Sequence, residues 1–183
     1  TRLEFKGRNI VFILYLSTMM IPITVRLIPS YNLCRNLNML DTYMGMILPQ
    51  VAWSIPFGTF LMRQFYMGIP KQLDEAAKID GANHFQIFWK ILLPNTKSSM
   101  TTLGIYTFIS AWNNLIWMLL SVRSESKWTV TLGISSICGA SVIKQPTWNL
   151  IMGVIVIGMI PVLILFFAFQ KYFMQSVAAT GIK

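Results

Sequence analysis

The sequence predicts an all-α protein, a polytopic bundle of transmembrane helices. Of its 183 residues, 55% are hydrophobic and only 11% are charged, and the mean hydropathy is +0.58. The apolar residues are gathered into charge-free runs, and crossing a bilayer takes about 20 such residues. This composition excludes a disordered, collagen-like or disulfide-rich chain. A soluble protein with buried helices is the alternative, and runs of this length disfavour it.

Four charge-free runs define the expected spans. We place them at about residues 9–28, 43–62, 98–122 and 147–170. The first run is short and is interrupted by Arg26, which we therefore expect near the membrane boundary. Prolines inside the runs predict bent helices, because membrane helices tolerate proline where neighbours satisfy the freed backbone groups. These prolines are Pro22, Pro49, Pro56 and Pro161.

Basic residues divide unevenly between the two sides of such a bundle. Ten of the 15 fall on the side that holds both chain ends, and five fall on the other side. Cytoplasmic loops are enriched in Lys and Arg, so we expect both ends of this segment to be cytoplasmic. The net charge of +9 then reports topology, which disfavours a nucleic-acid partner. Cys34 and Cys138 would lie on the outer side, where a disulfide is permitted but not required.

The connection between the second and third spans, residues 63–97, carries more helix signals than a connector requires. Pro70 suits the first position of a short helix, in which Asp74 would pair with Lys78 one turn later. Gly81 would end this helix. The two adjacent alanines within it would let another surface approach closely.

A second short helix follows in the same connection. Asn83 and Gln86 have the spacing of a capping box, and Pro94 would close the unit. The helical spacing puts four apolar residues on one face: Phe85, Phe88, Trp89 and Leu92. A pair of this kind suits docking of a cytoplasmic protein, but it also suits an amphipathic element on lipid headgroups. Periodicity alone leaves both interpretations open.

The same connection carries a spaced motif, EAA-x3-G-x9-I-x-LP. Its fixed positions are Glu75, Ala76, Ala77, Gly81, Ile91, Leu93 and Pro94. This motif resembles the EAA loop of the membrane subunits of ATP-binding-cassette importers, and the flanks resemble the carbohydrate branch, close to the maltose-type second permease. The flanking matches are Thr18–Pro22, Leu61–Phe65, Ile79–Ala82, Phe88–Ile91, Ala111–Asn113 and Phe169–Phe173. The resemblance runs from about Lys6 to Lys183. It implies a six-span fold of which this chain holds the last four, with the cytoplasmic EAA coupling loop at residues 63–97.

The resemblance implies a bacterial cytoplasmic-membrane importer for a sugar or oligosaccharide. The chain would pair with a sister permease, two ATPase subunits would dock from the cytoplasm, and an extracytoplasmic solute-binding protein would deliver solute. The motif residues Glu75–Gly81 would couple the ATPase to the spans. The sequence has no Gly-x4-Gly-Lys-Ser/Thr loop, so we expect a transport subunit without an enzymatic site or cofactor, whose partner binds the ATP. Other solutes, such as glycerol phosphate, a polyamine or an oxyanion, would use the same loop.

Polar and aromatic residues within the spans are candidates for the solute path. They are Gln50, Trp53, Tyr106, Trp112, Asn113 and Asn114. The two asparagines also suit polar contacts between helices, and we expect Trp117 and Trp148 to be interfacial anchors. An ion-coupled transporter would keep an ionisable residue at mid-membrane, and the charge-free stretches hold none, with Arg26 the only charge near one. A scaffold protein would leave the spaced motif unexplained. His84 lies without a metal-ligand partner, so we expect no metal site.

Overall fold

The computed structural model describes residues 2–143 and 148–181, with side chains described for 2–139 and 148–170. The described residues form helices and turns without a strand, which confirms the all-α prediction. They divide into two compact units. Thr147, at the start of the fourth expected span, lies outside the described residues, as do Lys144 and Lys183, which entered the charge count.

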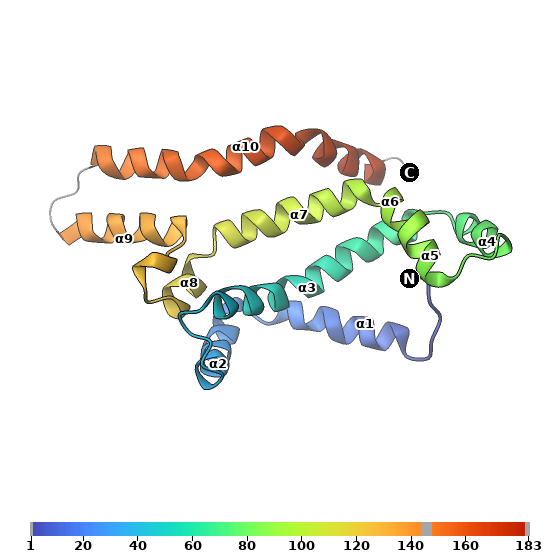
Figure 1. The fold of residues 1–183 in the computed structure, drawn as a ribbon, viewed down its shortest axis with the longest axis horizontal. Helices are drawn as coiled ribbons and strands as arrows, with labels where there is room; N and C mark the ends of the chain where they lie inside the picture. Colours follow the sequence, from blue (N-terminus) through green and yellow to red (C-terminus); the bar gives the residue numbers. More distant parts are fainter. Residues whose placement is uncertain (1, 144–147, 182–183) are drawn as a thin grey trace. The chain divides into compact units, whose positions relative to one another are not determined.

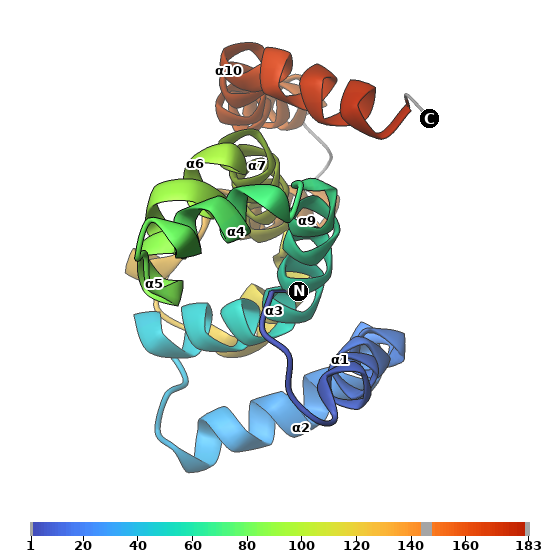
Figure 2. The same cartoon turned by 90° about the vertical axis from the view of Figure 1, so that its right-hand side faces the viewer.

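The first unit comprises the chain up to Met19, Ile55–Ile105 and the segment from Phe169. Its elements are α1 (Arg8–Ser17), the carboxyl-terminal part of α3 (Tyr43–Gly68), α4 (Gln72–Ile79), α5 (His84–Ile87), the π-helix η2 (Phe88–Leu92), α6 (Leu93–Asn95) and the start of α7 (Lys97–Trp112). Figures 1 and 2 show α4, α5 and α6 gathered beside the carboxyl-terminal end of α3. Arg63 lies within α3, with its guanidinium 3.7 Å from the ring centre of Phe12.

The second unit comprises Met20–Ser54 and Tyr106–Ala168. Its elements are α2 (Ile23–Asn36), the amino-terminal part of α3, the end of α7, α8 (Leu115–Ser121), the short η3 (Glu125–Lys127), α9 (Val130–Ile143) and most of α10 (Trp148–Gly181). Its buried core consists of Leu27, Cys34, Met46, Trp117, Met118, Val122 and Leu132. Cys34 and Cys138 are both free thiols.

The helices of the described chain include membrane-spanning candidates. By length and composition, α3 and Trp148–Gln170 of α10 could each cross a membrane. Two further candidates are helix pairs bent by more than 40° at a short break, Arg8–Met20 with Ile23–Asn36 and Lys97–Trp112 with Leu115–Ser121. The described chain thus holds two helices that are long and apolar enough to cross a membrane, or up to four candidate spans if each bent pair counts as one.

The breaks in these helices have different causes. Pro22 is the N-cap residue of α2 and lies at the first break, as its sequence position predicts. The second break contains no proline and was not expected. There, the side chain of Asn114 accepts a hydrogen bond from the backbone N–H of Trp117 at 3.3 Å and so caps α8. Asparagine favours such caps because its oxygen satisfies a free N–H of the first turn.

Helix α9 was also not expected, because residues 123–146 contain no run of span length. Its apolar part, Val130–Gly139, is shorter than the helices counted as candidate membrane spans. It follows α8 closely and packs against it. A search for charge-free runs of about 20 residues passes over a helix of this length.

Candidate functional site

Helix α4 is the central element of the predicted coupling loop. It begins at Gln72 with Lys71 as N-cap, so Pro70 lies in the preceding turn rather than at the first helical position. At its other end, Gly81 adopts a left-handed φ of 80°. The N–H of Gly81 bonds the carbonyl of Lys78 at 3.0 Å, and the N–H of Ala82 bonds that of Ala77 at 2.9 Å. This bonding pattern is a Schellman motif, so Gly81 ends the helix as predicted.

The two alanines of the motif lie on different faces of α4. Ala77 is buried and forms a small core with Ile87 and Leu92. Glu75 and Ala76 are exposed, and the side chain of Ile79 is 87% exposed. Helix α4 is thus fixed by one face and presents the other, where an acidic and an apolar side chain are available for contact.

The expected pairing of Asp74 with Lys78 is wrong. Asp74 is buried, and its Oδ2 lies 3.1 Å from Nη1 of Arg2, from the amino-terminal segment. Lys78 is exposed. A partly buried guanidinium is a stronger partner for a buried carboxylate than an exposed ammonium on the same helix, because the surface pair is screened by water. Sequence reasoning missed Arg2, because its partners are more than sixty residues away.

Helix α5 begins as predicted. The side chain of Asn83 accepts from the N–H of Gln86, and the side chain of Gln86 accepts from the N–H of Asn83, both at 2.9 Å. This capping box fixes the amino-terminal end of the second short helix. Its carboxyl-terminal end differs from the expectation, since α5 passes into the π-helix η2 after Ile87.

The expected single apolar face of the second helix is therefore wrong. Phe85 is 71% exposed and Trp89 is 53% exposed, whereas Ile87 and Leu92 are buried. The expected spacing assumed 3.6 residues per turn, and a π-helix turn changes the phase of the side chains. The exposed rings of Phe85 and Trp89 lie with their centres 6.0 Å apart.

The end of the motif also differs from the expectation. Pro94 does not close the helical unit but stands in the first turn of α6, where its missing N–H leaves no bond unmade. Pro94 is exposed, Leu93 is half-buried, and Ile91 packs against the core around Ala77. The motif residue Ile91 thus anchors the loop, and Glu75, Ala76 and Gly81 lie on its surface.

The solute-path candidates fall into separate groups within the second unit. Nδ2 of Asn114 donates to Oε1 of Gln50 at 3.0 Å, so this pair joins α3 to the start of α8. Nε1 of Trp112 donates to the carbonyl of Gly158 in α10 at 3.3 Å. Tyr106 and Asn113 are exposed. The structure brings Gln50 and Asn114 together; a role for any of these residues toward solute stays a prediction.

Trp53 belongs to a cluster of aromatic and cationic side chains. Its ring packs edge-on against Trp117 with the centres 5.2 Å apart, and the guanidinium of Arg26 lies 5.6 Å from its ring centre. Arg26 stands inside α2, and its Nε is buried without a hydrogen-bond partner. Arg26 thus lies against an aromatic ring of its own unit.

The expectation that Trp117 is an interfacial anchor is wrong. Its side chain is fully buried, and its Nε1 donates to the carbonyl of Gly45 at 3.0 Å. In a regular helix that carbonyl would accept from residue 49, which is Pro49 and has no N–H. Trp117 therefore supplies the donor that Pro49 lacks. Trp148, the other expected anchor, is 64% exposed.

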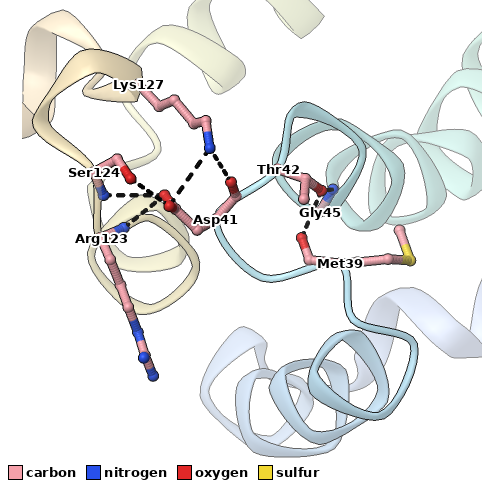
Figure 3. A network of polar contacts seen from close by, with 7 residues as sticks. All are labelled: Met39, Asp41, Thr42, Gly45, Arg123, Ser124 and Lys127. Carbon is pink, nitrogen blue, oxygen red and sulfur yellow. Dashed lines mark hydrogen bonds and ion pairs between the residues drawn. The ribbon is translucent and has the colours of Figure 1, made fainter.

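Asp41 is a second residue that sequence reasoning missed. Figure 3 shows it in the turn before α3, with its carboxylate facing the segment after α8. Its Oδ1 accepts from the backbone N–H groups of Arg123 and Ser124 at 3.0 Å each, and its Oδ2 accepts from the Ser124 hydroxyl. Lys127 donates to the Asp41 carbonyl and lies 3.5 Å from Oδ2. The Ser124 hydroxyl, the two amides and Lys127 hold the pKa of Asp41 well below its usual range.

Comparison with known proteins identifies the family. The family described as "Binding-protein-dependent transport system inner membrane component" matches residues 1–179. The chain belongs to this family. It is 34% identical over 180 residues to the arabinooligosaccharides transport system permease protein AraQ of Bacillus subtilis, covering 98% of this chain and 62% of AraQ.

Two further permeases are similar over most of this chain. The sn-glycerol-3-phosphate transport system permease protein UgpE of Yersinia enterocolitica is 38% identical over 94% of this chain and 60% of its own length. The probable ABC transporter permease protein YurM of Bacillus subtilis is 33% identical over the whole chain and 60% of its own length. The chain thus spans about three fifths of the length of the curated permeases it matches.

The family assignment confirms the resemblance drawn from the spaced motif, and it agrees with the all-helical fold. Permeases of this family are inner-membrane components, which fits the apolar helices α3 and α10. Among the described residues, no group of three or more His, Cys, Asp or Glu side chains is placed to hold a metal ion.

Proposed function

We propose that this chain is part of the permease subunit of an ATP-driven importer for a sugar or oligosaccharide. The exposed face of α4 carries the proposal. It presents Glu75, Ala76 and Ile79 outward, while Ala77 holds the opposite face in a closed core. Ile79 is 87% exposed beside the exposed carboxylate of Glu75, so both side chains are free to contact a partner protein.

The proposed partner of this face is a separate ATPase subunit on the cytoplasmic side. ATP binding and hydrolysis belong to that subunit, and the permease supplies the path. Closure of the ATPase dimer would displace α4, and the displacement would reach the spans through α3 and α7, which flank the loop. A sister permease and an extracytoplasmic solute-binding protein complete the proposed complex, with both ends of this segment cytoplasmic.

The sugar assignment is supported by the relative AraQ, whose name specifies arabinooligosaccharides. A second candidate is glycerol phosphate, favoured by the relative UgpE. Arg26 suits a phosphate-bearing solute because it places a guanidinium inside α2, within the first bent pair of apolar helices. Uptake of radiolabelled arabinooligosaccharide and of glycerol 3-phosphate by the reconstituted complex distinguishes the two.

The docking proposal is tested by changing the exposed face alone. Ile79→Asp in the full-length permease places a charge on the proposed contact without touching the core, because the side chain is almost fully exposed. We expect the variant to reach the membrane, to lose co-purification of the ATPase subunits and to lose uptake. Leu37→Asp, at an exposed apolar position directly after α2, is the matched control and keeps both. Normal association of Ile79→Asp with the ATPase would show that α4 is not the docking element.

A further inference from the structure

Arg2 connects two helices that the proposed mechanism requires to move together. Its Nη2 donates to the carbonyl of Tyr66 at 3.0 Å and to that of Ile69 at 2.6 Å. Its Nη1 lies 3.1 Å from Oδ2 of Asp74. The first two partners are in the last turn of α3 and directly after it, and Asp74 is in the first turn of α4.

The chemistry of the two helix ends explains why an arginine suits this place. The last carbonyls of α3 have no partner within their helix and carry partial negative charge, so a cation there is favourable. The first turn of α4 carries partial positive charge, which favours the carboxylate of Asp74. The planar guanidinium presents several N–H groups in a fixed fork, so one side chain reaches both ends.

The contact is largely withdrawn from water. The side chains of Arg2 and Asp74 are only 14% and 11% exposed. Nε of Arg2 and Oδ1 of Asp74 are buried without a hydrogen-bond partner. Removing either side chain would therefore leave the other charge buried and uncompensated, which is much more unfavourable than losing a surface ion pair.

We propose that Arg2 is a positioning residue that tethers the coupling helix α4 to α3, so that a displacement of α4 is passed to the membrane-spanning helix. Next to this polar contact, Tyr66 and Ile69 also pack against the core that holds Ala77. Apolar contacts of this kind tolerate sliding, whereas the fork of Arg2 fixes direction and distance. The proposal rests on the docking function proposed above.

The test uses the full-length permease assembled with its ATPase and sister subunits in proteoliposomes. For Arg2→Ala we expect uptake per ATP hydrolysed to fall about tenfold or more, in the range of mutations that interrupt coupling between sites. We expect ATPase co-purification and ATP hydrolysis to stay near wild type, because the outward face of α4 is intact. Lys6→Ala is the matched control: it removes an exposed cation four residues along the same segment and leaves coupling unchanged.

Two further variants keep the proposal testable if Arg2→Ala fails to accumulate in the membrane. Arg2→Lys keeps the charge but not the fork, and we expect an intermediate loss of coupling. Asp74→Asn keeps the shape, and its amide oxygen still accepts from Arg2, so we expect a smaller loss than for Arg2→Ala.

The outcomes separate the tether from the docking proposal. Normal uptake per ATP in the Arg2 variants, with ATPase association lost in Ile79→Asp, overturns the tether and leaves docking in place. Loss of the ATPase subunits in Arg2→Ala also overturns the tether, because Arg2 would then only maintain the fold of α4. Normal association in Ile79→Asp overturns the docking proposal itself.

Discussion

The hydrogen bond from Trp117 to the carbonyl of Gly45 should depend on Pro49. Trp117→Phe keeps an aromatic ring in the fully buried site but removes the donor, so the Gly45 carbonyl is left without a partner. In Pro49→Ala, the new N–H at position 49 can bond that carbonyl within the helix. The effect of Trp117→Phe on stability should therefore be smaller when residue 49 is alanine.

The coupling free energy between positions 117 and 49 follows from the two contributions to the effect of Trp117→Phe on the free energy of unfolding. The smaller ring leaves a void whose cost is similar in both backgrounds and cancels in a double-mutant cycle. The remaining part is the unsatisfied carbonyl, roughly 1–3 kcal/mol in protein interiors. Hydrogen bonds between membrane helices average about 0.6 kcal/mol and reach about 1.7. We therefore expect a coupling free energy of about 1 kcal/mol.

The assay is reversible unfolding of the full-length permease in mixed micelles, for wild type, both single variants and the double variant. Pro56→Ala with Trp117→Phe is the control cycle, because the carbonyl that Pro56 frees belongs to Ala52 and not to Gly45. We expect the control cycle to be additive within about 0.5 kcal/mol. Equal effects of Trp117→Phe in the wild-type and Pro49→Ala backgrounds would refute the assignment of Trp117 as the substitute donor.

Three other predictions concern single sites. Gly81→Ala should destabilise the loop by about 1–2 kcal/mol, measured by hydrogen exchange, because alanine is strained in the left-handed backbone conformation of this residue. No atom lies within 4 Å of the added Cβ, so the backbone alone causes this effect. The control Gly68→Ala, at a glycine whose φ is not positive, should change hydrogen exchange in the loop little. Because the folded pKa of Asp41 is depressed, its stabilisation is present above the unfolded pKa of about 4 and lost as pH falls further; Asp41→Asn should flatten the acid side of the stability–pH curve, and an unchanged slope would contradict this. Trp89→Glu should weaken co-purification of the ATPase with the permease and leave co-sedimentation of the permease with anionic vesicles unchanged. Loss of co-sedimentation alone would favour the interpretation of the second short helix as a lipid-binding element.

The sequence was sufficient where the signal is local. Charge-free runs indicate apolar helices such as α3, because charge is costly in a bilayer wherever the helix packs. The capping box of Asn83 and Gln86 and the helix end at Gly81 are also local, since each satisfies backbone groups within a few residues. These features were predicted and are present.

The sequence was insufficient where a side chain has a distant partner. Asp74 has a suitable lysine one turn away, yet it pairs with Arg2, which no helical spacing could indicate. A tryptophan near the end of an apolar run has the same neighbours in the sequence whether its side chain faces lipid headgroups or a buried carbonyl. The role of Trp117 could therefore be seen only once α3, which supplies the Gly45 carbonyl, was placed beside it. The π-helix η2 takes the buried Leu92 off the face of the exposed Phe85 and Trp89, because one wider turn shifts every later side chain.

Arg2 and Trp117 have distant partners that the sequence did not indicate. Both donate hydrogen bonds to backbone carbonyls at or near α3 that lack a donor within the helix. Near its start, Pro49 removes an N–H and leaves the carbonyl of Gly45 to Trp117. At its end, the helix stops, and the carbonyls of Tyr66 in its last turn and of Ile69 directly after it accept from Arg2. A backbone carbonyl buried without a donor is unfavourable by several kcal/mol in an apolar medium, so such positions recruit donors from elsewhere in the chain. In an apolar helix, a proline or a helix end therefore indicates where to look for a tryptophan or arginine whose partner the local sequence cannot reveal.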